Sequence, residues 1–316
     1  MPFSHNPPLL SANTVIATAV RTGRVFGKGL SVLRWFLGHA QSDQVKAKVF
    51  ASYQPTARDV FIATFPKSGT NWAMQMVAQV AWHGQAEFGH IHDLVPWPEA
   101  RFHGLLALDD PSSWEPCPTG KRGIKTALGS HHVPYDEAAT YVTVVRDPKE
   151  VVVSSYHFIC GVFGLGKEIT VDQWCADFLG GSFIAGSWAE HTAGYWAWRN
   201  RPNVEVMCFP RMKDDLPGTV DRVARVMGVS FTRTQRSRVI ERCSFAHMKA
   251  NESKFAPPQM RFVDGTAAMI RKGESGASGE LLSRAQQAAI DRHCQAELLR
   301  LGADFPYADV FDVVEG

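Results

Sequence analysis

The chain has 316 residues, of which 45% are hydrophobic and 20% charged, the composition of a globular protein with a sizeable core. A net charge of +2 argues against a surface that coats nucleic acid, so we expect no nucleic-acid partner and only local functional charge. The six cysteines form no C-x-x-C pair, and no apolar run is long enough to span a bilayer. We therefore expect free thiols and a cytoplasmic location.

The first 42 residues contain no Asp or Glu and carry four basic residues, Arg21, Arg24, Lys28 and Arg34. Helical spacing places four apolar residues on one face, namely Phe26, Leu30, Leu33 and Leu37. One interpretation is a basic amphipathic helix that lies on a membrane or acts in targeting. The other, which we adopt, is a helix packed on the domain. We expect a helical segment over residues 1–50 and one domain over residues 51–316.

Residues 60–65 form a β-branched and aromatic run that predicts a buried strand. Pro66 ends the strand, and Gly69 permits a tight turn. Apolar residues from Ala73 to Ala81 then follow helical spacing. A strand, a glycine turn and a helix together direct free N–H groups and the positive end of a helix dipole at one point, where a phosphate can bind. Lys67 adds a charge there, but it precedes the Gly, which is the wrong order for a Walker loop.

The motif F-P-K-S-G-T-N-W at residues 65–72 resembles the 5′-phosphosulfate loop of the cytosolic-type sulfotransferases. These enzymes move a sulfuryl group from 3′-phosphoadenosine-5′-phosphosulfate (PAPS) to a hydroxyl or amine. The resemblance implies that the loop binds PAPS through Lys67, Ser68, Gly69, Thr70, Asn71 and Trp72. It also implies that Lys67 meets the charge that develops on the leaving 5′-phosphate oxygen. Taken alone, this stretch could also be a strand–turn–helix with an accidental lysine.

Residues 84–110 are rich in Gly, Pro, His and aromatic residues and predict a long ordered loop. His90, His92 and Asp93 could begin a metal site, but no further ligand has a suitable spacing, so we interpret them as loop residues. The segment L-V-P-W-P-E at residues 94–99 resembles the family segment that walls the acceptor pocket. It makes Trp97 and Phe102 candidates for contact with the acceptor.

The second predicted strand, G-I-K-T-A-L at residues 123–128, resembles the family's K-T-H-L. In the family the Lys contacts the sulfuryl group, and Lys125 matches it. The family's general base is the His, whose place is taken here by Ala127. Three explanations stay open: an inactivated variant, an enzyme with another base, or a binding protein. His131 or His132 in the following loop could supply a base, although the simpler interpretation is loop histidines.

Residues 141–145 predict a central parallel strand that leads into R-D-P-K-E. Asp147 is a helix cap, and Glu150 has the spacing of a capping box. Arg146 and Ser154 match the family residues that grip the ribose 3′-phosphate.

Residues 204–209 predict a fourth strand, and residues 281–301 predict a structural helix. By resemblance, Phe209 lies beside the adenine, and S-F at Ser244 and Phe245 supplies a ring that stacks on it, with Trp72 on the opposite face. R-K-G at Arg271, Lys272 and Gly273 resembles the late loop that closes over the 3′-phosphate.

These features predict one α/β domain with a mostly parallel central sheet flanked by helices and a P-loop-like nucleotide site at the C-terminal strand ends. The resemblance implies a sulfotransferase that uses PAPS, releases PAP, needs no metal and acts on a small-molecule hydroxyl or amine. Two alternatives are a PAPS- or PAP-binding protein with impaired turnover and a nucleotide-dependent kinase with a divergent phosphate loop. The kinase would need carboxylates for magnesium, and none lies in residues 60–80.

Overall fold

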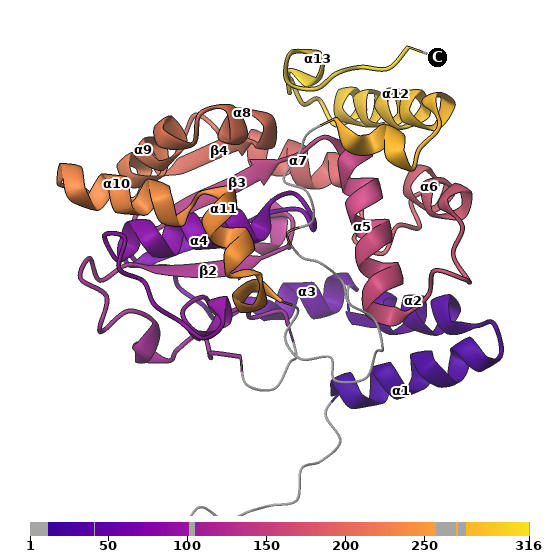
Figure 1. Ribbon diagram of the computed structural model, residues 1–316, viewed down its shortest axis with the longest axis horizontal. Helices are drawn as coiled ribbons and strands as arrows, with labels where there is room; N and C mark the ends of the chain where they lie inside the picture. Colours follow the sequence, from indigo (N-terminus) through magenta and orange to yellow (C-terminus); the bar gives the residue numbers. More distant parts are fainter. Residues whose placement is uncertain (1–11, 41, 101–104, 257–269, 271–275, 316) are drawn as a thin grey trace, which may run out of the picture.

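Four parallel strands form the centre of the protein (Figure 1). The computed structural model describes residues 12–40, 42–100, 105–256, 270 and 276–315. The strands are β1 Asp59–Ala63, β2 Arg122–Thr126, β3 Thr140–Val145 and β4 Val204–Cys208, in the order β2–β1–β3–β4. The chain therefore runs from β1 to β2 on one side of β1, and then crosses over to β3 and β4 on the other side of β1. Open parallel sheets bind ligands at such a reversal, beyond the carboxyl ends of the strands.

The two faces of the sheet carry different side chains because successive residues of a strand point to opposite sides. Val60 and Ile62 of β1 pack with α4 (Thr70–Ala81). Phe61 points to the other face, where its ring stacks on that of Tyr141 at a centroid distance of 5.1 Å. Both faces are covered, which explains why the predicted strands are continuous apolar runs.

Four further helices share a buried apolar cluster with α4 and the sheet. They are α8 Phe209–Asp214, α9 Leu216–Val226, α10 Arg233–Arg242 and α11 Phe245–Ala250. The second helical layer consists of α5 Pro148–Phe163, α6 Val171–Leu179, α7 Trp188–Trp196, α12 Arg284–Arg300 and α13 Tyr307–Val310. The buried carboxylate of Asp291 holds this layer together, because it accepts bonds from Lys149 Nζ at 2.5 Å and from the Tyr307 hydroxyl at 2.6 Å.

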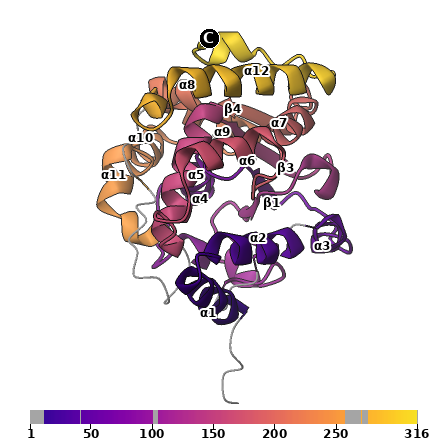
Figure 2. The same ribbon diagram turned by 90° about the vertical axis from the view of Figure 1, so that its right-hand side faces the viewer.

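The N-terminal segment forms two helices, α1 Ala12–Val25 and α2 Gly29–Ala40, and a short third, α3 Asp43–Val49. Figures 1 and 2 both place α1 at the opposite end of the molecule from α12 and α13. Val20 and Leu33 are buried against the second helical layer, as the packing interpretation predicts. The predicted apolar face is wrong at Phe26, which is 73% exposed in the turn that Gly27 makes between the helices.

The remaining predicted elements agree with the structure apart from their ends. The first predicted strand begins one residue earlier and ends at Ala63, and the C-terminal helix begins at Arg284 rather than at residue 281. The predicted long loop contains one 3-10 turn, Ile91–Asp93, and a second, Pro111–Ser113, follows it directly. Three other such turns are Ser130–His132, Glu252–Phe255 and Ala277–Glu280. No helix within the described ranges has both the length and the apolar character needed to cross a bilayer.

Candidate active site

The predicted site residues gather where the four strands end. Lys67 lies in the loop after β1, Ala127 follows β2 directly, and Arg146 and Phe209 follow β3 and β4. Lys125 lies near the end of β2, paired in register with Ile62 of β1. Because all four strands are parallel, these residues share one edge of the sheet.

The phosphate loop has a backbone that depends on glycine. Gly69 caps α4 with φ of +98°, and a Cβ there would lie 2.9 Å from Cδ2 of Phe209. Glycine offers no side chain to cap the helix, so the first N–H groups of α4 face the site available for an anion. The hydroxyls of Thr64 and Thr70 lie 2.6 Å apart and tie the two sides of the loop.

Lys67 also has a positive φ, +70°, which is strained for a residue with a side chain. Its ammonium lies 4.3 Å from the ring centroid of Phe158 on α5. Burial, with the charge of Arg146 as the second cause, lowers the pKa of Lys67 to about 8. The surroundings of Lys67 thus destabilise its charged form, and a bound anion would stabilise it.

Lys125 is held in a similar state. Its Nζ lies 3.2 Å from the ring centroid of Trp97, and its backbone N–H donates to the carbonyl of Pro96. Burial, opposed by the carboxylate of Glu99 and assisted by the charge of Lys67, lowers the pKa of Lys125 to about 7. The charge of Lys67 thus reaches Lys125, which indicates that the two side chains face a common space.

Arg146 links the phosphate loop to α5. Its Nη1 donates to the carbonyl of Lys67 at 2.9 Å, its Nε donates to Glu150 at 2.9 Å, and its Cζ lies 4.6 Å from the ring centroid of Phe209. These bonds use two of the five guanidinium N–H donors. The predicted capping box is wrong: Asp147 caps α5 by accepting from the N–H of Lys149, whereas Glu150 turns to Arg146.

Ser154, the second residue predicted at the 3′-phosphate, is partly exposed on α5. It lies one helical turn from Glu150 and one from Phe158, so these three share a face of the helix. Since Glu150 contacts Arg146 and Phe158 contacts Lys67, Ser154 faces the same side of the site as the phosphate loop.

Aromatic residues flank the place predicted for adenine. The ring of Trp72 packs edge-on against Phe209 at a centroid distance of 5.6 Å, and its Nε1 donates to the carbonyl of Cys243 at 2.8 Å. The next residue, Ser244, caps α11, and Phe245 follows with 44% of its surface exposed. Trp72 is therefore fixed beside the segment that carries Phe245, and their stacking on a base stays a prediction.

Phe102, Arg271, Lys272 and Gly273 lie outside the described residues. The described residues beside R-K-G are nevertheless anchored near the site. Ile270 donates its N–H to Glu252 and accepts from Lys249 Nζ, which joins it to α11 and the turn after it. Gly276 donates its N–H to Glu150, the partner of Arg146. Asn71 is joined to the segment before this loop, since its Nδ2 donates to the carbonyl of Phe255 at 3.3 Å.

Of the two histidines after Ala127, His132 is directed toward α3 and away from the lysines. His132 Nε2 lies 3.5 Å from the carboxylate of Asp43 on α3, and the exposed ring of His131 folds over Gly129. In the long loop, His90 and Asp93 form the capping box of a 3-10 turn, and Nδ1 of the buried His92 bonds the carbonyl of Val95. Within the described ranges, no group of three or more His, Cys, Asp or Glu residues is placed to hold a metal ion.

Comparison with known proteins identifies the family. A family model described as "Sulfotransferase domain" matches residues 57–302, most of the chain. The chain belongs to the sulfotransferase family. It is similar to sulfotransferase 2A1 of Macaca fascicularis, with 28% identity over 258 residues, 79% of this chain and 87% of that protein. It is also similar to the amine sulfotransferase of Oryctolagus cuniculus, with 25% identity over 270 residues, 81% of this chain and 84% of that protein.

The fold agrees with this assignment. The crystal structure of retinol dehydratase in complex with androsterone and the inactive cofactor PAP matches with a TM-score of 0.66 at 19% identity, covering 83% of this chain and 86% of that one. At this identity the likeness concerns the fold. The predicted α/β fold and the predicted family are both confirmed.

Sequence reasoning missed one partly buried group of this sulfotransferase, Glu99. Its Oε1 accepts the backbone N–H of Ala127 at 2.6 Å, at the position predicted for the family's histidine. Burial raises the pKa of Glu99, opposed by the Ala127 hydrogen bond and by the charge of Lys125. The signal available in the sequence was the acidic residue that ends the L-V-P-W-P-E segment, but nothing in the motif shows that it reaches β2.

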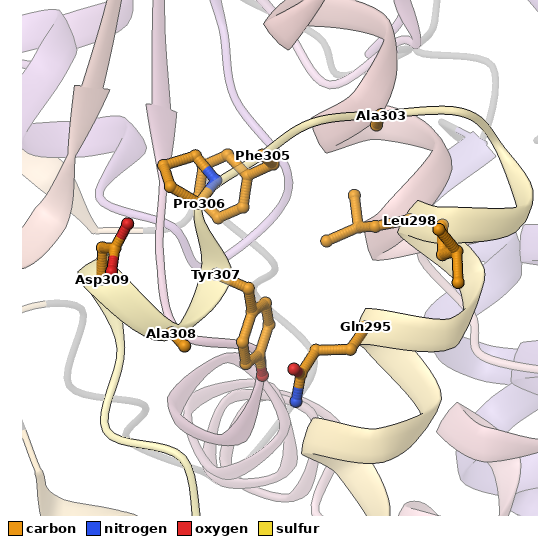
Figure 3. Close-up of a pocket in the computed structure, with 9 residues that line it drawn as sticks. Gln295, Leu298, Ala303, Phe305, Pro306, Tyr307, Ala308 and Asp309 are labelled. Atoms are coloured by element: carbon orange, nitrogen blue, oxygen red, sulfur yellow. The ribbon is translucent and has the colours of Figure 1, made fainter.

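A surface cavity of about 300 Å³ lies elsewhere in the sulfotransferase, between α12 and the C-terminal turn (Figure 3). It is lined by Gln295, Leu298, Leu299, Ala303, Phe305, Pro306, Tyr307, Ala308 and Asp309. None of the predicted site residues that the structure describes lines it, so we do not assign the reaction to it.

Proposed function

We propose that this sulfotransferase moves the sulfuryl group of PAPS to a hydroxyl or amine of a small-molecule acceptor and releases the sulfated product and PAP. The observation that carries the proposal is the pair of partly buried lysines, Lys67 and Lys125, at the reversal point of a parallel sheet. Buried cations that repel each other are stabilised when an anion comes between them. The PAP bound in retinol dehydratase, a protein of the same fold, supports PAPS as that anion.

In-line sulfuryl transfer depends mainly on positioning and on neutralising charge. Lys67, at the start of α4, is placed to stabilise the charge that develops on the leaving 5′-phosphate oxygen. Lys125 is placed to hold the sulfuryl oxygens during transfer. A sulfuryl group carries less negative charge than a phosphoryl group, so we propose that the lysines and the helix N-terminus suffice without a metal.

The remaining residues would select the nucleotide. Arg146 and Ser154, on the α5 side, would hold the 3′-phosphate together with the R-K-G loop, Arg271, Lys272 and Gly273. The described anchors of that loop, Ile270 and Gly276, support this placement. The rings of Trp72, Phe209 and Phe245 would border the adenine.

The acceptor would meet an aromatic wall. Trp97 lies against the ammonium of Lys125, so it borders the point of transfer, and we propose that Trp97 and Phe102 contact the acceptor. Such a wall suits a small, partly apolar alcohol or phenol. The names of related proteins support both an alcohol and an amine, since one structure contains androsterone and one relative is an amine sulfotransferase.

Ala127 favours a second candidate function, a PAPS- or PAP-binding protein with weak or no turnover, because a methyl group cannot accept the proton of an acceptor. One experiment separates the two functions. Calorimetric titration with PAP and AMP is followed by transfer from labelled PAPS to a panel of alcohols, phenols and amines. PAP binding with transfer supports the enzyme, and PAP binding without transfer to any member supports the second function. Equal, weak binding of PAP and AMP would refute both.

A further inference from the structure

The family's general base is missing at Ala127, yet a carboxylate lies at the same place. Ala127 directly follows β2, two positions after Lys125, and residues two apart in an extended chain point to the same side, so a side chain at 127 would project toward the space that Lys125 faces. Glu99 reaches that point from the long loop, with its Oε1 2.6 Å from the N–H of Ala127. Its other oxygen, Oε2, is buried, and the side chain of Trp97 lies close enough to the carboxyl group to lower its pKa through a hydrogen bond.

From this geometry we infer that Glu99 takes the place of the family's histidine as the general base that removes the acceptor's proton. The inference rests on the proposed transfer from PAPS. In the step, the acceptor oxygen bonds to sulfur while the bond from sulfur to the 5′-phosphate oxygen breaks, and that electron pair leaves with PAP. The acceptor's proton passes to Oε2 of Glu99 and from there to water.

The groups that face Glu99 suit this role. Lys125 on β2 lies close enough to favour the ionised carboxylate, and Tyr195 of α7 lies close enough for the carboxylate to raise the pKa of the tyrosine. Burial acts in the opposite direction and raises the pKa of Glu99. A carboxyl group whose basicity is increased toward neutral pH is a better proton acceptor than an exposed one. When PAPS holds Lys125 and Lys67 as ammonium ions, the carboxylate stays ionised beside them.

The nearby histidines are weaker candidates. Burial, with the charge of Lys125 as the next cause, lowers the pKa of His92 to about 3. Burial likewise lowers the pKa of His191 on α7 to about 3. Both imidazoles are thus neutral and too weakly basic to take a proton from an alcohol. His132 faces Asp43 on α3, away from Lys125.

The test compares an alcohol with a phenol that is already largely ionised. Wild type, Glu99→Gln, Glu99→Asp and the double variant Glu99→Gln/Ala127→His are assayed with PAPS and either 4-nitrophenol or a panel of aliphatic alcohols that includes androsterone. Glutamine keeps the size of Glu99 and can still accept from Ala127, but it cannot take a proton. His131→Ala and His132→Ala are the matched controls for a base in the loop.

We expect Glu99→Gln to lower kcat for the best alcohol by about 10²–10⁴-fold, the usual cost of losing a general base, and kcat for 4-nitrophenol by less than about tenfold. The Kd for PAP should stay within about threefold of wild type, and the acidic limb of the pH profile of kcat/KM should disappear. Glu99→Asp should keep that limb with partial activity. Because an imidazole can accept the proton, the double variant should transfer to the alcohol at least about tenfold faster than Glu99→Gln.

Equal losses with both acceptors and an unchanged pH profile would overturn the inference, because Glu99 would then act only by positioning Lys125. Loss of alcohol transfer in His131→Ala or His132→Ala, with activity retained in Glu99→Gln, would place the base in the loop. Wild-type transfer to 4-nitrophenol and to no alcohol would also overturn it. Failure of wild type to bind PAP would instead refute the proposed function, so the two failures are distinguishable.

Discussion

Raising the pH should weaken PAP binding through the two partly buried lysines, Lys67 and Lys125. In the free protein, burial lowers the pKa of Lys67 to about 8 and that of Lys125 to about 7. A phosphate beside them favours the ammonium form and returns both pKa values toward the ordinary 10.5. Binding above pH 7 therefore takes up protons, and the affinity falls as the pH rises above the free-protein values. Below pH 7 both lysines are mostly charged, and this dependence fades.

The expected size follows from these values. At pH 8 binding should take up about 0.9 proton at Lys125 and about 0.5 proton at Lys67, treating the two as independent. Between pH 7 and 9 the affinity for PAP should fall by about 10²–10³-fold. The phosphate monoesters of PAP, whose second pKa is about 6, are almost fully ionised over this range and contribute little.

Calorimetry at pH 8 in two buffers of different ionisation enthalpy gives the number of protons taken up. In Lys125→Met the uptake on PAP binding should fall to about 0.5 proton, and in Lys67→Met it should fall to about 0.9 proton. Lys121→Met is the matched control: burial also lowers the pKa of Lys121, but its Nζ donates to Ala57 at the opposite end of β2. An affinity that is flat from pH 7 to 9, with no proton uptake, would refute the reasoning that an anion binds between Lys67 and Lys125.

Three further predictions concern the nucleotide and the stability of the loop that binds it. Arg146→Ala should weaken PAP by about 10–100-fold but hardly change AMP, since a charge-assisted bond to the 3′-phosphate is lost; equal calorimetric losses for both would contradict this role. Lys67→Ala should lower kcat by about 10²-fold or more and change PAP affinity less, because the charge it meets grows in the transition state; normal kcat at saturating PAPS would disprove it. Gly69→Ala should lower the free energy of unfolding by about 1–3 kcal/mol, given its φ of +98° and the nearby Phe209 ring, and an unchanged urea midpoint would argue otherwise.

The sequence predicted the parts of the site that local rules control. A β-branched and aromatic run predicted β1, short segments predicted the other three strands, and the glycine turn predicted the start of α4. Once those strands are parallel, topology alone brings Lys67, Arg146 and Phe209 to one edge of the sheet. No long-range information was needed for this step, because each residue lies within a few positions of a strand end.

Prediction from sequence failed at Glu150 and Phe26, where a periodic pattern in the sequence competes with a contact or a backbone conformation that the pattern does not contain. Glu150 has the spacing of a capping box, yet its carboxylate is more strongly stabilised by the guanidinium of Arg146 than by one N–H group. Phe26 has the period of a helical face, but Gly27 adopts φ of +64° and ends the helix before Phe26 can pack. In both cases the deciding contact or conformation competes with the periodic pattern.

Glu99 shows why a missing motif residue does not settle whether a function is lost. A motif assigns a role to one position on one strand, whereas the chemistry requires only that a proton acceptor reach the acceptor oxygen. The loop that carries Glu99 crosses the end of β2, where Pro96 accepts the N–H of Lys125 and Glu99 accepts that of Ala127. These two bonds fix the loop at the end of β2 and hold the carboxylate of Glu99 beside Ala127. A substitution at 127 therefore removes a side chain from a site whose walls already contain a second base.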